Sequence, residues 1–224
     1  MALTDLTLLA DVFDFPEEGH ARRIEEVLET IGGLYPEAQA DLSLFVGPVS
    51  RMTVDEIQEL YTRTFDIQPI TTLDVGFVMF GDDYKRGELL SNLNREHNDC
   101  GNDCGNELAD HLPNILRLIA RLGRTEMTKE LADMIVAPAI RAMVREFDPA
   151  RVTQKNKYYR KQYKTLIDVP EVDSAVYVHA IRACYIVLAA EFGLPPVDTI
   201  EVEETSDFLK AIRVENATEK AQGS

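Results

Sequence analysis

The residues best suited to chemistry stand just before a helix in the middle of the chain. Glu107, Asp110 and His111 place two carboxylates and an imidazole in one short turn, and general acid–base catalysis uses these residue types. A hydrolytic site also needs a nucleophile or a cofactor. The sequence contains no Gly-x-Ser-x-Gly turn, no phosphate-binding glycine loop and no His-Glu-x-x-His helix. We therefore expect a protein that is not an enzyme.

An amphipathic helix should position this turn. Asp110 is suited to cap the first helical turn, and Pro113 is tolerated there because its missing N–H has no helical partner. Gly123 is suited to end the helix, and His111 would help to fix the loop. The apolar positions at helical spacing are Leu112, Ile115, Leu116 and Ile119.

A second group of side chains has the chemistry of zinc ligands. It consists of His97, Cys100, Cys104 and His111. Structural zinc sites usually repeat a short cysteine spacing at a second knuckle, and Cys100 and Cys104 have no such partner pair. Three interpretations are open: a metal site, a reversible disulfide between the two thiols, and an uncommitted glycine-rich loop, which the sequence favours. A working metal or disulfide loop would make the chain a small metal- or redox-sensing helical protein.

Four aromatic residues upstream are core residues by default, but they would form an apolar groove if some of them faced outward. They are Tyr61, Phe65, Phe77 and Phe80. The carboxylates that would edge this groove are Asp66, Asp82, Asp83 and Asp110. Such a groove suits a short amphipathic helix that carries arginine and aromatic side chains. The net charge of −16 also favours a basic partner over nucleic acid or an anionic membrane.

Several short motifs resemble a known family. In order they are Leu60-Tyr61, Phe65-Asp66, Phe80-Gly81-Asp82, Arg86-Gly87 and Glu107-Leu108-Ala109-Asp110-His111-Leu112-Pro113. Their order and spacing resemble the redox-enzyme maturation chaperones of the TorD/DmsD/NarJ type, above all the assembly chaperone, or delta subunit, of respiratory nitrate reductase. Ala109 stands where that family usually has proline, and Phe77-Val78-Met79-Phe80 replaces a run that contains Tyr and His.

The resemblance implies a cytoplasmic, TorD-like chaperone without a cofactor of its own. Its partner would be the N-terminal segment of a molybdopterin-containing catalytic subunit, and it would assist insertion of the molybdenum cofactor, alone or with the cofactor-insertion machinery. Some members exchange helices, so a homodimer is an open expectation. The predicted peptide-binding residues are Tyr61, Phe65, Asp66, Phe77, Phe80, Asp82, Arg86, Glu107, Asp110, His111 and Leu112.

Helical periodicity dominates the rest of the chain. It predicts a single-domain, all-α bundle of about eight to ten helices in residues 1–197, with the apolar segment from Ser174 to Phe192 at its centre. We expect Thr71 to Phe80 to be helical, because no nearby segment offers a pairing partner and the family's matching segment is helical. Pro138 should kink or split the helix that contains it. Residues 198–224 read as an acidic, mobile tail with one apolar group, Phe208, Leu209 and Ile212.

The sequence also limits where the protein works. Met1 to Asp14 carries no Lys or Arg and so does not read as a signal peptide, and no apolar run approaches the roughly 20 residues of a membrane span. Three cysteines argue against a secreted disulfide framework.

Arg151 to Lys164 interleaves basic and aromatic residues. In so acidic a chain we expect these cations to pair with the protein's own acids rather than with nucleic acid.

Overall fold

The computed structural model describes residues 3–163 and 174–196. Within these ranges the chain is helical, and its one extended pairing is an isolated antiparallel bridge between Asp74 and His111. The prediction of an all-α bundle is confirmed. No helix in these ranges is both long enough and apolar enough to cross a bilayer. The predicted tail, residues 198–224, lies outside the described residues.

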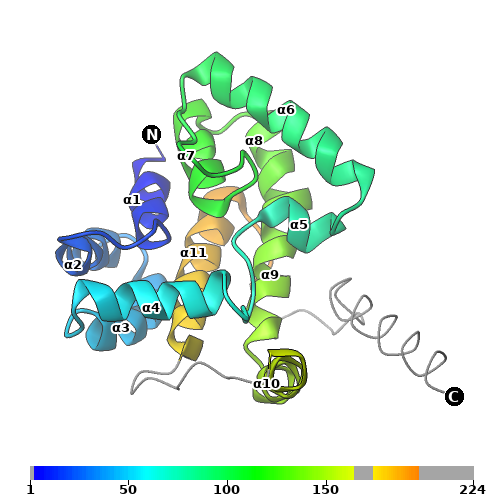
Figure 1. Cartoon of the computed structure of the whole chain (residues 1–224). Helices are drawn as coiled ribbons and strands as arrows, with labels where there is room; N and C mark the ends of the chain where they lie inside the picture. Colours follow the sequence, from blue (N-terminus) through cyan, green and yellow to red (C-terminus); the bar gives the residue numbers. More distant parts are fainter. Residues whose placement is uncertain (1–2, 164–173, 197–224) are drawn as a thin grey trace, which may run out of the picture.

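The helices form two groups on either side of a central helix, α11 (Figure 1). The first six are α1 (Thr4–Val12), α2 (His20–Gly32), α3 (Pro36–Val49), α4 (Val54–Phe65), α5 (Val75–Phe80) and α6 (Tyr84–Cys100). The rest are α7 (Leu112–Leu122), α8 (Glu126–Leu131), the π-helical turn η1 (Ala132–Val136), α9 (Ala137–Glu146), α10 (Pro149–Tyr163), the short 3₁₀ turn η2 (Ser174–Val176) and α11 (Tyr177–Phe192).

Helix α11 is the centre of the bundle, as its apolar sequence predicts. It packs against α3, α9 and α1. Its residues are buried on nearly every side, and the Tyr177 ring lies 4.7 Å from the Phe45 ring and 4.9 Å from the Phe65 ring, measured between centroids. Cys184 is fully buried in this helix, which raises the pKa of its thiol to about 12. The thiol therefore behaves as a small core side chain.

Local signals in the sequence set several helix ends. The sequence Thr53-Val54-Asp55-Glu56 has the pattern that predicts a capping box. The box forms at the start of α4: the Glu56 N–H donates to Thr53 Oγ1, and the Thr53 N–H donates to Glu56 Oε2. Gly123 ends α7 with a φ of 67°, a conformation that residues with a Cβ rarely adopt.

Pro138 does not break its helix. Segments α8, η1 and α9 follow one another without interruption, and the π-helical turn lies directly before the proline. Within that turn the Ala137 N–H donates to the carbonyl of Ala132. The wider turn changes the bonding pattern where a proline removes a donor, so the helix continues.

The helix predicted for Thr71 to Phe80 is correct for Val75–Phe80 alone. The four residues before it are not helical, and Asp74 pairs with His111. A pairing partner therefore exists, but it comes from the turn before α7, more than thirty residues later. That distance in the sequence hides it from local periodicity.

Candidate functional site

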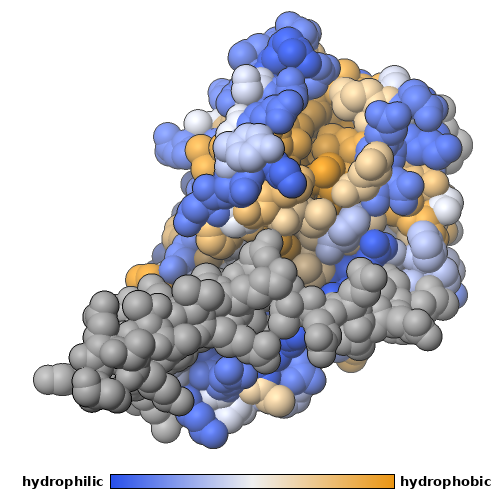
Figure 2. Space-filling model, turned by 90° about the vertical axis from the view of Figure 1, so that its right-hand side faces the viewer, coloured by the Kyte–Doolittle hydropathy of each residue, from blue (hydrophilic) through white to orange (hydrophobic). Residues whose placement is uncertain are grey.

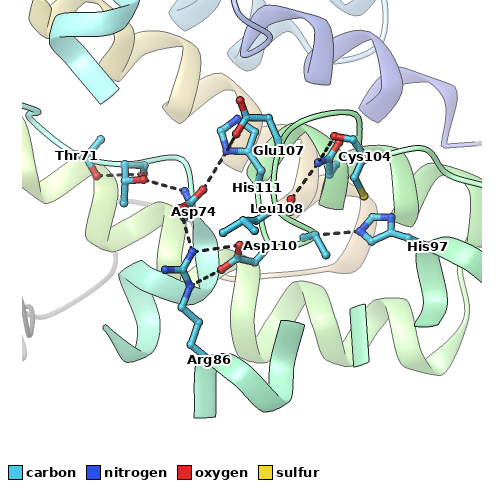
Figure 3. Close-up of polar contacts among 12 residues, drawn as sticks. Thr71, Asp74, Arg86, His97, Cys104, Glu107, Leu108, Asp110 and His111 are labelled. Atoms are coloured by element: carbon cyan, nitrogen blue, oxygen red, sulfur yellow. Dashed lines mark hydrogen bonds and ion pairs between the residues drawn. The ribbon is translucent and has the colours of Figure 1, made fainter. Parts of the chain in front are cut away.

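Backbone hydrogen bonds join the start of α5 to the turn before α7. The Val75 N–H donates to the Asp110 carbonyl at 2.9 Å, next to the bridge that sets Asp74 opposite His111. Figure 3 shows the side chains of Asp74, Asp110 and His111 gathered around this junction. The turn that carries the two acids and the imidazole is thus fixed against α5.

A chain of charged hydrogen bonds runs through this junction (Figure 3). Arg86 Nε lies 2.9 Å from Asp110 Oδ2, and Arg86 Nη2 lies 2.9 Å from Asp74 Oδ2. The other oxygen of Asp74 lies 3.1 Å from His111 Nδ1. Asp110 is completely buried, so the guanidinium supplies the positive charge that a buried carboxylate requires. We call Asp74, Arg86, Asp110 and His111 the α5 network.

Ion pairing within the α5 network keeps Asp74 and Arg86 charged. Burial raises the pKa of Asp74, but the hydrogen bond from His111 and the charge of Arg86 outweigh it and hold that pKa below its usual value. Burial lowers the pKa of Arg86, and its two carboxylate partners more than compensate. Glu107 stays at the edge, 60% exposed and 4.0 Å from His111. These groups hold one another in place.

The prediction that Asp110 caps α7 is wrong. His111 occupies the N-cap position and makes no side-chain capping bond, while Pro113 lies in the first turn as expected. The Asp110 carboxylate points to Arg86 instead. A charge-assisted bond to a guanidinium is stronger than a neutral backbone cap, which explains the choice.

Gly76 allows the Asp110 carboxylate to lie against α5. A Cβ at this position would stand 2.5 Å from Asp110 Oδ2 and 3.1 Å from a methyl carbon of Leu89. Real side chains do not approach so closely. A glycine is therefore needed for contact between α5 and the carboxylate.

Helix α5 also lines a cavity of about 500 Å³. Its walls come from the segment before α5, from α5 and the turn that follows, and from α9 and α10. The lining residues are Pro69, Ile70, Thr71, Thr72, Phe77, Val78, Phe80, Gly81, Asp82, Asp83, Ala142, Glu146 and Lys155. This volume lies within the usual range for ligand pockets.

The cavity is apolar inside and acidic at one edge. Phe77, Val78 and Phe80 are half-buried on α5, and Asp82 and Asp83 are exposed in the turn to α6. Figure 2 shows this side of the molecule, with apolar side chains gathered at its centre and hydrophilic ones flanking them. Such a surface can accept an apolar side chain that has a cation beside it.

A buried ion pair forms part of the cavity wall. Lys155 Nζ lies 2.8 Å from Glu146 Oε2, and Arg151 Nη1 lies 3.1 Å from Glu146 Oε1. Lys155 also donates to the carbonyl of Ile70. Burial lowers the pKa of Lys155, and Glu146 offsets part of that shift. As predicted, these cations of α10 pair with an acid of the protein, and Lys155 is buried.

Helix α10 also holds the segment before α5. Tyr159 Oη donates to the carbonyl of Pro69 at 3.2 Å, next to the bond from Lys155 to Ile70. The cavity wall from Pro69 to Thr72 is thus tied to a helix, although it has no regular structure of its own. A wall fixed in this way is largely formed before any ligand arrives.

Arg86 connects the cavity to the α5 network. Its guanidinium carbon lies 5.2 Å from the centre of the Phe77 ring, while its nitrogens bind Asp74 and Asp110. Cations and aromatic faces attract each other at this distance. The network therefore positions a ring of the cavity wall as well as the turn before α7.

The predicted peptide-binding residues divide into four groups. Those that line the cavity are Phe77, Phe80 and Asp82. Those in the α5 network are Arg86, Asp110 and His111. Those buried in the core are Tyr61, Phe65 and Leu112, and those at the surface nearby are Asp66 and Glu107.

Tyr61 and Phe65 belong to an aromatic cluster rather than to the cavity. Each is 5% exposed, and their ring centroids lie 5.1 Å apart and 6.2 Å and 4.9 Å from the Tyr177 ring. Edge-to-face packing of this kind is favourable in a core. The two rings position α4 against α11, in keeping with the default expectation for aromatic residues at helical spacing.

The loop after α6 uses His97 for structure. The Nε2 atom of His97 lies 3.0 Å from the Ala109 carbonyl, and Nδ1 lies 2.9 Å from the Asn102 side-chain amide. Both ring nitrogens are thus engaged within the protein. Cys100 and Cys104 are free thiols, and within residues 3–163 and 174–196 no three His, Cys, Asp or Glu side chains converge in a way that could hold a metal ion.

Sequence reasoning missed Asp74, Glu146 and Lys155. Asp74 precedes a helix and reads as an ordinary cap, although it makes no side-chain capping bond there. Glu146 and Lys155 come from two helices joined by a short turn. An acid near the end of one helix and a lysine within the next were the available signal, but spacing alone does not show that both face inward.

No family model matches the chain, and no curated protein matches it. A functional assignment therefore rests on the short motifs of the sequence and on the geometry of the cavity and the α5 network.

Proposed function

We propose that the chain is a non-catalytic maturation chaperone that binds the N-terminal segment of a molybdopterin-containing catalytic subunit, similar to that of nitrate reductase. The observation that carries this proposal is the cavity beside α5, with its apolar wall and the carboxylates of Asp82 and Asp83 at its edge. A short amphipathic segment with an aromatic or branched anchor and a neighbouring arginine matches both features.

The motifs behind the family resemblance support a chaperone of this type. Arg86, Asp110 and His111 meet in the α5 network, and Phe80 and Asp82 lie on the cavity. In this proposal the network holds α5 at a fixed position and the cavity receives the peptide. The two groups of motif residues then serve one surface through the same helix.

The anchor and the charges have different roles in binding. Burying one aromatic or aliphatic side chain in the cavity contributes about 1.5–3 kcal/mol, so the anchor supplies most of the affinity. The exposed carboxylates at the edge speed the encounter with a basic segment and disfavour acidic ones. Selection of the client thus depends on both an apolar side chain and a cation.

Occupying the client's N-terminal segment would delay its maturation until the cofactor is in place. A subunit that waits for a molybdenum cofactor exposes apolar surface and is prone to misassembly. A chaperone that binds the immature form stabilises that form by mass action and is released once the finished fold buries the site. Such a role belongs in the cytoplasm, before the client docks or is exported.

Calorimetric titration with synthetic N-terminal peptides from molybdoenzyme subunits tests this function. We expect a dissociation constant well below about 1 mM. Replacing the anchor side chain with serine should weaken binding by about tenfold or more, which corresponds to the burial of one apolar side chain. A scrambled peptide of the same composition is the control. The proposal fails if no leader peptide binds more tightly than the scrambled one.

A further inference from the structure

The described chain ends beside α9, which forms one wall of the cavity. Tyr185 Oη donates to the carbonyl of Pro195 at 2.7 Å and accepts from Arg141 Nη1 at 2.9 Å. Arg141 comes directly before Ala142, which lines the cavity. The chain therefore leaves the described region at Pro196 beside α9, the helix that forms one cavity wall.

The segment that follows contains one group of residues with the chemistry proposed for a ligand of the cavity. Residues 197–224 are mostly polar and acidic, but Phe208-Leu209-Lys210-Ala211-Ile212-Arg213-Val214 combines four apolar side chains larger than alanine with two cations. An aromatic anchor with neighbouring basic residues is the pattern that the apolar wall and the acidic edge would select. Nothing in the proposed function accounts for this group so far.

The connecting chain is long enough. Phe208 follows Pro196 by 12 residues, and an extended chain of that length spans up to about 40 Å. A compact chain of this size has a radius of gyration of about 17 Å. Because the exit point already lies beside α9, the segment can reach the cavity without stretching.

We infer that residues 208–214 of the same chain occupy the cavity when no client is bound. This inference rests on the proposed function, because it makes the chain's own segment a competitor of the client peptide. Phe208 or Leu209 packs against the rings of α5, and the two cations of the segment lie near Asp82 and Asp83. The cavity is then covered during the time in which no client is present.

Competition of this kind sharpens selection. A short tether gives the segment an effective concentration of about 1 mM at the cavity. Suppose that the segment binds the cavity with an intrinsic dissociation constant ten times lower than this effective concentration. The apparent dissociation constant of every competing peptide then rises by about tenfold. Weakly matching peptides are then excluded, while a client with a good anchor and cations still displaces the segment.

Fluorescence of the full chain tests the inference directly. The chain has no tryptophan, so Phe208→Trp introduces a single reporter inside the apolar group, and Ala217→Trp provides a matched reporter outside it. We expect the indole of Phe208→Trp to emit at a shorter wavelength than that of Ala217→Trp and to be quenched several-fold less by acrylamide. Adding Ala142→Phe, which fills the cavity, should make the two reporters equally accessible.

Further variants and a competitor keep the outcomes distinct. Asp82→Lys with Asp83→Lys changes two exposed residues, of which Asp83 also caps α6. It should likewise raise quenching of the Phe208→Trp reporter, which covers the case in which Ala142→Phe fails to fold. A leader peptide that binds should release this reporter. A shielded reporter with no peptide binding would support the inference and defeat the proposed function.

Three results would overturn the inference. The first is equal quenching of the Phe208→Trp and Ala217→Trp reporters while a leader peptide still binds, which would leave the proposed function intact. The second is a shielded Phe208→Trp reporter that responds neither to the cavity variant nor to the edge variants. The third is shielding that disappears on dilution, because the occupant would then be the segment of a second copy.

Discussion

The backbone of Gly76 is in contact with the carboxylate of Asp110, close enough that a Cβ on Gly76 would lie 2.5 Å from Asp110 Oδ2. This contact joins the helix that lines the cavity to the turn that carries the Asp–His motif. Because Asp110 is buried and held by Arg86, it cannot swing away to make room. The position of the cavity wall and the position of the turn therefore depend on each other.

Gly76→Ala should destabilise the protein. Forcing a methyl group into a filled space costs about 1–3 kcal/mol of unfolding free energy. Gly87→Ala is the matched control, because Gly87 lies in helix α6 and its Cβ would meet nothing within 4 Å. That control should be neutral or stabilising by up to about 1 kcal/mol. Urea denaturation of both variants measures the difference, and equal midpoints would argue against a close contact at Gly76.

Arg86→Ala should be far more harmful than removal of an exposed arginine. It leaves the buried Asp110 without its cation, and breaking a buried pair typically costs about 3–5 kcal/mol. Arg95→Ala is the comparison, because Arg95 is 63% exposed and pairs with its neighbour Glu96; it should cost less than about 1 kcal/mol. Thermal unfolding followed by circular dichroism distinguishes the two. Similar losses would mean that Asp110 finds another partner.

His20 should make stability fall in mild acid. Burial, reinforced by the charge of Arg23, lowers the pKa of its imidazole from 6.5 to about 4. The unfolded chain therefore binds a proton more readily than the folded one between these values. The stability contributed by neutral His20 is complete above pH 6.5 and is lost as pH falls toward 4, at about 1.4 kcal/mol per pH unit.

The variant His20→Met isolates this effect. Both ring nitrogens of His20 lack a hydrogen-bond partner within the described structure, so an apolar replacement leaves no bond broken. Urea denaturation at a series of pH values measures the free energy of unfolding. Between pH 6.5 and 4 this free energy should fall by about 3 kcal/mol less in the variant than in the native chain. Parallel curves for the two proteins would show that His20 titrates normally.

Reversing the charges at the cavity edge should slow binding of a basic peptide. Asp82→Lys with Asp83→Lys is expected to lower the association rate by about tenfold at low salt, and the difference should shrink as salt screens the charges. Glu25→Lys with Glu29→Lys makes the same change in net charge on α2, which packs against α1 and α3. Stopped-flow kinetics of all three proteins would contradict this account if both variants were slowed equally.

Much of the fold could be predicted from local patterns. The capping box at Thr53, the stop at Gly123 and the apolar α11 each depend on residues close together in the sequence, and the structure confirms all three. Helical propensity and periodicity are local, so one sequence is enough to read them.

The site was harder to predict, because its contacts join distant segments. Asp110 looks like a cap until Arg86 is known to lie beside it, and Asp74 looks like the start of a helix until His111 pairs with it. Phe77 and Phe80 line the cavity while Tyr61 and Phe65 are in the core, although all four have the same spacing signal. Which face of a helix meets solvent is decided by tertiary packing, and no local pattern records it.

The most direct test of the central claim is calorimetric titration of one leader peptide into the native chain and into Ala142→Phe, which places a ring in the cavity. If the cavity beside α5 receives the anchor, the native chain binds with a dissociation constant well below about 1 mM, and the variant loses about tenfold or more in affinity while its melting temperature stays close to that of the native chain. Equal affinity for the two proteins would contradict the claim, because the peptide would then bind somewhere other than this cavity.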